Sequence, residues 1–145
     1  MPERETVERA REDAREGKSP STQAGEFVRE EMHHIREGKH GAASARQAIA
    51  IGLSKARRAG VRLAAKGSAS TQKKAEQDSR ASQSRRKPSR TRSRAASNAL
   101  KREPRSAASR GSLSRQANSS AASRGKRARS VAAKKAAQTR TRRAA

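Results

Sequence analysis

The chain has 145 residues and a formal net charge of +24; only 30% of its residues are hydrophobic, and Phe27 is its single aromatic residue. This composition offers too little apolar surface for an ordinary domain of this length. The absence of cysteine excludes disulfide cross-links and thiolate zinc fingers. The first residues form no apolar signal segment and no stretch is long enough to span a membrane, so we expect a cytoplasmic protein.

The charges are distributed unevenly along the chain. Residues 1–37 hold ten of the thirteen acidic residues against seven basic ones, whereas residues 38–145 hold thirty basic residues and three acidic ones. A segment that repels itself this strongly needs a polyanion to become compact. Nucleic acid is therefore the expected partner, and we expect no cofactor and no small-molecule substrate.

Residues 1–18 form the first of three expected segments. Arginine and glutamate alternate there at helical spacing, and Val7 is the only sizeable apolar side chain. The pattern predicts a frayed, solvated N-terminal helix that ends at Gly17.

Residues 19–66 form the second segment, which contains a predicted helical hairpin over about residues 20–60. Ser19 before Pro20 is typical of a helix N-cap, and Ser44 is the expected start of the second helix. Gly38 and Gly60 are the expected C-terminal stops. The apolar side chains of the two helices recur at spacings of three and four residues: Ala24, Phe27, Val28, Met32 and Ile35, then Ala45, Ala48, Ile49, Gly52, Leu53 and Ala56.

Two features of this hairpin indicate what it contacts. The seam of its second helix consists mostly of small residues, while Ile51 projects away from that seam and would be exposed in a lone hairpin. Glu31 falls on the apolar side of the first helix, where Arg46 or Lys55 would be a suitable partner, within the hairpin or across a dimer. We expect the hairpin to self-associate through large apolar side chains, namely Phe27, Ile35, Ile49, Ile51 and Leu53.

Residues 67–145 form the third segment, a basic tail composed almost entirely of serine, alanine, arginine and lysine. The hexapeptide SAASRG occurs at 106–111 and again at 120–125, as in a simple expanded repeat. Such a segment buries too little surface to offset its ordering entropy. The sequence therefore predicts a mainly α protein with extensive disorder, in which a short helical hairpin carries a long disordered tail.

The string QAIAIGLSKARRAG at 47–60, within residues 19–60, resembles the signature region of a family of small basic bacterial proteins of unknown function. Members of that family are commonly described as DNA-binding or plasmid-stabilisation proteins. The Ser/Ala/Arg-rich tail is similar to the tails of the same family and, more loosely, to those of linker histones. The resemblance implies a bacterial setting and association with DNA.

Binding of phosphate backbones is the function that the composition favours. Guanidinium groups contact phosphate oxygens in pairs, and each neutralised phosphate releases counterions, so ten contacts predict a slope of log K against log salt of about −9. The candidate contact residues are Lys39, Arg46, Lys55, Arg57, Arg58, Arg62, Lys66, Arg85, Arg86, Lys87, Arg90, Arg92, Arg94, Arg127, Arg129, Lys134, Lys135, Arg140, Arg142 and Arg143.

The expected function is therefore non-enzymatic, largely sequence-independent binding of duplex DNA by a nucleoid-associated protein. A helix-turn-helix reader is less favoured, because such a reader normally rests on a third helix. DNA is favoured over RNA because no aromatic platform is available for stacking bases. Two alternatives remain open: an RNA-binding or ribosome-associated protein, and a regulatory adaptor of the plasmid-maintenance or antitoxin type that acts through the hairpin.

We expect neither a catalytic site nor a metal site. His33 and His34 are adjacent, so they point about 100° apart on a helix and cannot chelate one ion together. The pairs His33–Glu37 and Glu30–His34 have ligand spacing, but ordinary surface pairs have it too. The sequence contains no Ser/His/Asp set and no glycine-rich phosphate loop.

Overall fold

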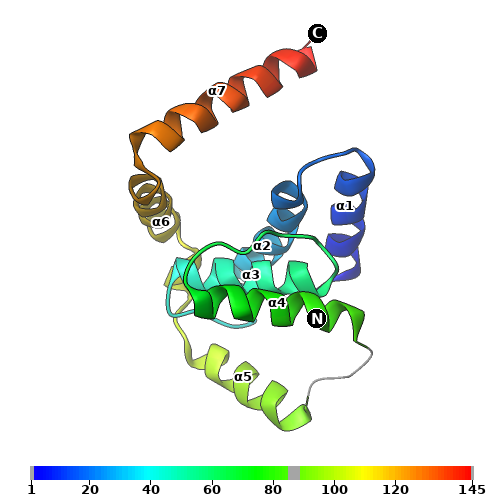
Figure 1. The fold of residues 1–145 in the computed structure, drawn as a ribbon. Coiled ribbons are helices and arrows are strands. Elements are labelled where there is room, and N and C mark those ends of the chain that lie inside the picture. Colours follow the sequence, from blue (N-terminus) through cyan, green and yellow to red (C-terminus); the bar gives the residue numbers. More distant parts are fainter. Residues whose placement is uncertain (1, 85–88, 145) are drawn as a thin grey trace. The chain divides into compact units, whose positions relative to one another are not determined.

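The computed structural model describes residues 2–84 and 89–144 and contains two compact units, residues 1–109 and 110–145. All described regular structure is helical (Figure 1). The first unit contains α1 (Arg4–Arg15), α2 (Pro20–Arg36), α3 (Ala45–Arg58), α4 (Ala69–Gln83), α5 (Arg90–Arg102) and the 3-10 helix η1 (Arg105–Ala108). The second unit contains α6 (Arg110–Ser123) and α7 (Gly125–Ala144).

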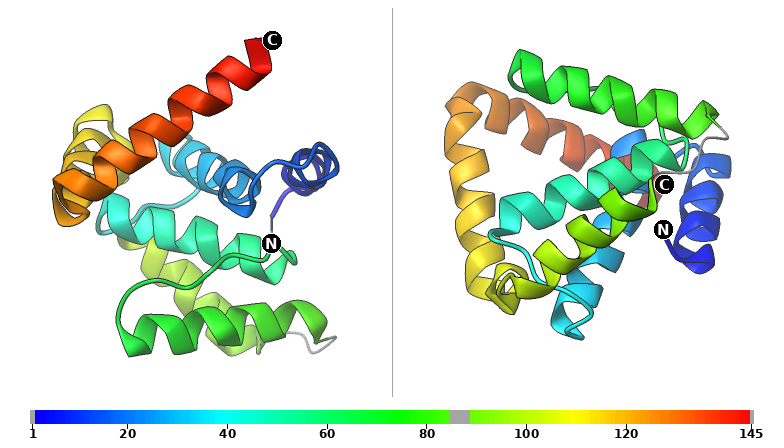
Figure 2. Two further views of the ribbon diagram at one scale, coloured as in Figure 1. Left: turned by 45° about the horizontal axis from the view of Figure 1, so that its top comes forward. Right: turned by 90° about the horizontal axis from the view of Figure 1, so that it is seen from below.

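In the first unit, helices α1, α2 and α3 each pack on the next helix along the chain. Helix α1 packs on α2, α2 on α3 and α3 on α4, while η1 contacts both α2 and α3 (Figure 2). Phe27 is fully buried among small side chains of three helices, Ala10, Ala24 and Ala56. This core is small, and alanines provide much of it.

The helical hairpin of α2 and α3 is present, and its ends lie where the sequence predicted them. The hydroxyls of Ser19 and Ser44 each accept a backbone N–H from the first turn of their helix, and Pro20 occupies the first helical position. Gly38 and Gly60 follow the two helices with φ values of +79° and +98°, which favour glycine.

Gly52 allows α2 and α3 to approach closely. A Cβ atom at this position would lie 2.7 Å from the Cα of Val28, closer than side chains tolerate. Ala45, Ala48 and Ala56 are buried on the same side of α3. The small-residue seam predicted for the second helix is therefore confirmed, and the backbone that it admits is that of α2.

The N-terminal helix is packed rather than frayed. Thr6 and Ala10 of α1 are buried against the rest of the first unit, and Arg9 donates to a carboxylate oxygen of Glu26 on α2 at 2.8 Å. The sequence interpretation looked for large apolar side chains and found only Val7. Alanine and threonine suffice here because α2 approaches closely.

The prediction of extensive disorder and of a long disordered tail is wrong, because helices α4 to α7 occupy that segment. Alanine, arginine and lysine are strong helix formers, and the interpretation gave this propensity less weight than the small apolar area of the segment. The hydroxyl of Ser68 caps the N-terminus of α4, and this helix packs on α3 through Ala75 and Asp78. The expected segments 19–66 and 67–145 therefore do not coincide with the two compact units, since α4 and η1 belong to the first.

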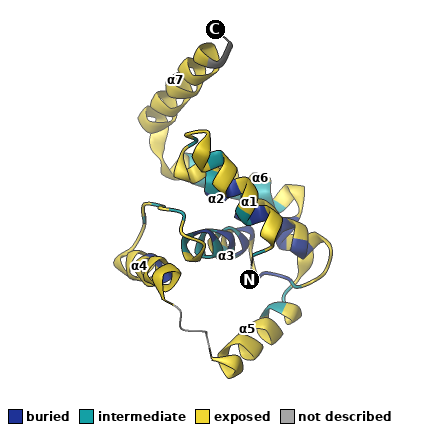
Figure 3. Cartoon of the chain, turned by 90° about the vertical axis from the view of Figure 1, so that its right-hand side faces the viewer, coloured by how far each residue is buried: buried dark blue, intermediate teal, exposed yellow. Residues whose placement is uncertain are grey.

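The second unit consists of α6 and α7, which meet at Gly125 with a φ of +72°. No side chain that the structure describes in this unit is buried, and Val131 on α7 is 61% exposed (Figure 3). Helix α7 is therefore exposed to solvent along its described length, while α6 has half-buried residues such as Leu113 and Gln116.

Candidate nucleic-acid interface

Two of the expected phosphate-binding residues on α3 are held in ion pairs inside the first unit. Lys55 Nζ lies 2.7 Å from Oε2 of the fully buried Glu31, and Arg58 Nη2 lies 2.9 Å from Oδ1 of Asp78 on α4. Lys55 as the partner of Glu31 is thereby confirmed, within one chain. These cations compensate carboxylates and contribute little free charge to a nucleic acid.

Lys39 is also held in ion pairs by the fold, whereas Arg57 is partly buried without one. Lys39 Nζ donates to carboxylates of Glu37 at 3.1 Å and Glu3 at 3.3 Å, and these two bonds raise the pKa of Lys39. Arg57 is half-buried, and its Nε has no hydrogen-bond partner among the described residues. The basic end of the hairpin is therefore more compensated than its sequence indicates.

The exposed bases of the first unit lie outside these pairs. Arg46 on α3 and Arg62 and Lys66 in the segment after it are exposed. Helix α5 carries no acidic residue, and it exposes Arg90, Arg92 and Arg94. Arg85, Arg86 and Lys87 lie outside the described residues.

Helix α7 carries the largest number of exposed bases among the described helices. The second unit has eleven lysine and arginine residues and no aspartate or glutamate. The candidates Arg127, Arg129, Lys134, Lys135, Arg140 and Arg142 are all exposed, while the side chain of Arg143 lies outside the described part of the helix.

Four of these bases share one face of α7. At 100° per residue, Arg127, Lys134, Lys135 and Arg142 fall within an arc of about 100°, with Val131 between them. Over fifteen residues this face extends about 22 Å along the helix axis. We call these four bases the α7 basic face.

An open groove also runs across the first unit, lined by residues of α1, α3, α4 and α5. Its lining includes bases such as Arg11, Lys74 and Arg92 as well as Ile51 and Leu53. The groove is thus basic in part, and it is the place where half-buried apolar side chains of α3 reach the surface.

The residues expected to mediate self-association divide into two groups. Phe27 and Ile35 are fully buried in the first unit, so this fold leaves them unable to contact a second copy. Ile49, Ile51 and Leu53 are half-buried. The hairpin covers more of its own apolar surface than the sequence indicated.

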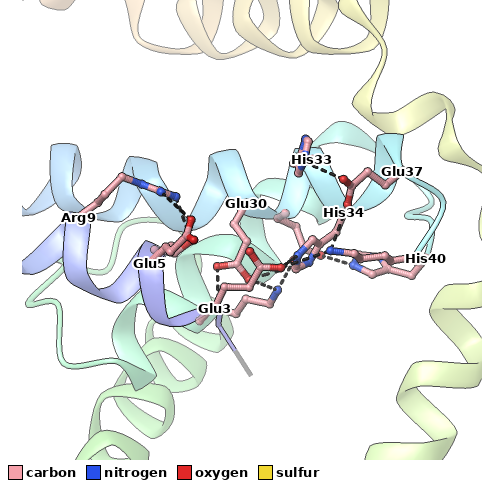
Figure 4. A network of polar contacts seen from close by, with 12 residues as sticks. Glu3, Glu5, Arg9, Glu30, His33, His34, Glu37 and His40 are labelled. Carbon is pink, nitrogen blue, oxygen red and sulfur yellow. Dashed lines mark hydrogen bonds and ion pairs between the residues drawn. The ribbon is translucent and has the colours of Figure 1, made fainter.

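A cluster of histidines and glutamates lies where the start of α1, the end of α2 and the following loop meet (Figure 4). Nε2 of His34 is 2.8 Å from Oε1 of Glu3 and its Nδ1 is 3.9 Å from Oε1 of Glu30, while Nε2 of His40 is 3.4 Å from Oε1 of Glu31. The hydrogen bond from His34 lowers the pKa of Glu3 most, and the hydrogen bond from Lys39 lowers it further.

The sequence interpretation foresaw this cluster only in part. His33 and Glu37 do form an exposed pair at 2.9 Å, but Glu30 and His34 are buried, so that pair is not an ordinary surface pair. The approach of His40 was missed because it comes from the loop after α2. The spacing of Glu31 and His34, three residues apart on one helix, was the available signal.

No known family model, curated protein or solved structure matches this chain. The resemblance of residues 19–60 to small basic bacterial proteins therefore stays a prediction. Within residues 2–84 and 89–144, no helix combines the length and apolar character that a bilayer crossing requires.

Proposed function

We propose that the protein binds duplex DNA without enzymatic activity and largely without regard to sequence, through contacts to the phosphate backbone. The observation that carries this proposal is the second unit, where eleven basic residues occur with no side-chain carboxylate among them. Those that the structure describes are exposed. No acidic side chain within the unit compensates this charge. Binding of an external polyanion therefore gives a large gain in electrostatic free energy.

The charge distribution on α7 favours phosphate contact over base reading. Bases surround this helix, and none of its described side chains is buried against a support. A recognition helix holds a few side chains rigidly against base edges, which requires packing of its opposite face on a core. Helix α7 lacks that packing, and its arginines and lysines suit the repetitive phosphate lattice.

Duplex DNA is a better ligand in this proposal than single-stranded RNA. Binding of single strands usually relies on exposed aromatic side chains that stack on bases. The only aromatic residue, Phe27, is fully buried. Stacking is therefore absent, and the electrostatic attraction that remains is strongest for the high charge density of a duplex.

The first unit also has exposed bases that are free to contact phosphate. Arg46, Arg62 and Lys66, with the arginines of α5, lack the ion pairs that occupy Lys55 and Arg58. We propose that they add phosphate contacts to those that α7 makes. Association with the bacterial nucleoid is the setting in which such a protein acts.

A salt titration of the full chain on duplex DNA, duplex RNA and single-stranded RNA of equal length tests this function. Steep loss of DNA binding with rising salt and similar affinity for unrelated DNA sequences are the expected results. Tighter binding to RNA would favour the ribosome-associated alternative. Binding to neither polymer at low ionic strength would refute the proposal and favour an adaptor.

A further inference from the structure

The cluster around Glu31 combines the side chains that zinc prefers. Glu31 and His34 lie one turn apart on α2, and His40 approaches from the loop that follows. One ligand atom from each of these three residues lies within 4.8 Å of the other two. Two imidazole nitrogens and one carboxylate oxygen form a common ligand set for zinc, with a fourth position open to water.

The Glu31 carboxylate is a buried group whose hydrogen-bonding capacity is unmet. The residue is fully buried, and neither carboxylate oxygen has a hydrogen bond of acceptable geometry among the described residues. Lys55 Nζ at 2.7 Å from Oε2 supplies charge without that geometry, and Oε1 has only Nε2 of His40 at 3.4 Å. A carboxylate oxygen in this position gains strongly from a cation beside it.

The two histidines are oriented as metal ligands usually are. Nδ1 of His40 lies 3.1 Å from the carbonyl oxygen of Gly41, and Nε2 of His34 lies 2.8 Å from the carboxylate of Glu3. A ring nitrogen that donates to an oxygen fixes the tautomer and leaves the lone pair on the other nitrogen. The nitrogens left to bind a metal are Nε2 of His40 and Nδ1 of His34.

The surroundings permit a divalent cation to enter. The side chains of His34 and His40 keep 11% and 16% of their surface exposed at the groove of the first unit, and the buried Glu31 borders the same groove. The carboxylate of Glu30 lies beside His34 and adds a second negative charge against the single ammonium of Lys55. Tetrahedral ligands at about 2.0–2.1 Å from zinc are about 3.3 Å apart, so small side-chain rotations would close the cluster.

We propose that Glu31, His34 and His40 bind one zinc ion per chain. The bound ion fastens the end of α2 to the loop that leads into α3. Through the hydrogen bond from His34 to Glu3, it also holds the start of α1. The site is distinct from the phosphate-binding surfaces, and its occupancy does not depend on DNA.

The test uses the full chain, freed of metal by a chelator and then titrated with zinc against a chromophoric competitor. We expect one ion per chain for the natural sequence and binding weakened by at least about tenfold in H40A. His33 provides the matched control, because H33A removes a neighbouring exposed imidazole that pairs only with Glu37. This variant should bind zinc as the natural chain does, and helicity measured by circular dichroism should be the same in all three.

A second variant reports direct coordination. Because the chain has no cysteine, H40C places the only thiol at the proposed site. Titrated with cobalt(II) in place of zinc, this variant should show thiolate-to-cobalt charge-transfer absorption that the natural chain lacks. Absence of stoichiometric zinc binding by the natural chain, equal loss in H33A and H40A, or no thiolate absorption in H40C would each overturn the site.

Discussion

Replacing the four bases of the α7 basic face by glutamine is the most direct perturbation of the proposed DNA contact. If Arg127, Lys134, Lys135 and Arg142 each neutralise one phosphate, their loss removes about 3.6 from the slope of log K against log salt. At 0.1 M salt, one decade below a 1 M reference, this corresponds to a loss of affinity of about 4,000-fold. If only two of them reach phosphate, the change is about 1.8 in the slope.

Fluorescence anisotropy of labelled duplex DNA over a series of salt concentrations measures both quantities. The matched control removes the same net charge from the first unit by replacing four exposed arginines on α1 and α2, namely Arg4, Arg11, Arg15 and Arg29. We expect their loss to change the slope by less than about one, because acidic residues surround them and keep phosphates away. Equal effects of the two variants would refute a contact located on α7.

Three further predictions concern the first unit. In denaturant unfolding, G52A should lower the free energy of unfolding by about 1–2 kcal/mol, because the clash with α2 outweighs the gain in helix propensity. G25A should raise it by about 0.5–1 kcal/mol, because nothing lies within 4 Å of a Cβ at that position. K55M should cost about 3–5 kcal/mol in denaturant unfolding by leaving Glu31 buried without its cation, and a cost below 1 kcal/mol would contradict that ion pair. The pKa of Glu3 is lowered from 4.5 in the folded chain, so ionised Glu3 stabilises the fold above that pH. Acid titration should show this stability being lost as the pH falls below 4.5, and E3Q should lack that loss.

The hairpin was predictable because its signals are local. A serine hydroxyl that caps a helix, as at Ser19 and Ser44, acts within one turn, and Gly38 and Gly60 adopt positive φ for reasons contained in the backbone. Gly52 was recognised as part of a small-residue seam by spacing alone. Such features need no knowledge of the rest of the chain.

The helices after residue 67 were not predictable from hydrophobicity. Small and polar side chains make the contacts that hold α4 and η1 to the hairpin, whereas α5, α6 and α7 bury none of their described side chains and rest on helix propensity. Ala107 and Ala108 of η1 are buried against the hairpin, and Asp78 on α4 forms an ion pair with Arg58 on the neighbouring helix α3. Each contact joins residues that are far apart in sequence. Alanine counts as little area in a composition, yet it fits where two backbones lie close together.

The histidine cluster was missed for a related reason. Ligand spacing was judged along one helix, where His33 and His34 cannot act together. The third member, His40, follows the C-terminal glycine of α2, and its direction depends on how the loop folds back. That loop is fixed by Gly41, whose N–H donates to the carbonyl oxygen of Leu100, 59 positions later, at 2.8 Å.

In the proposed complex, the acidic residues of the N-terminal third limit which bases can contact a polyanion. A base that is already paired with a buried carboxylate is not free to bind a phosphate. Moving Lys55 from Glu31 to a phosphate would leave a buried carboxylate without a cation, at a cost of about 3–5 kcal/mol. One phosphate contact returns about 1.2 kcal/mol at 0.1 M salt, which is the energy of 0.9 decades in affinity. We therefore expect the ion pair to persist if DNA binds as proposed. In that proposal the phosphates contact bases without a buried partner, and these are most numerous on α7.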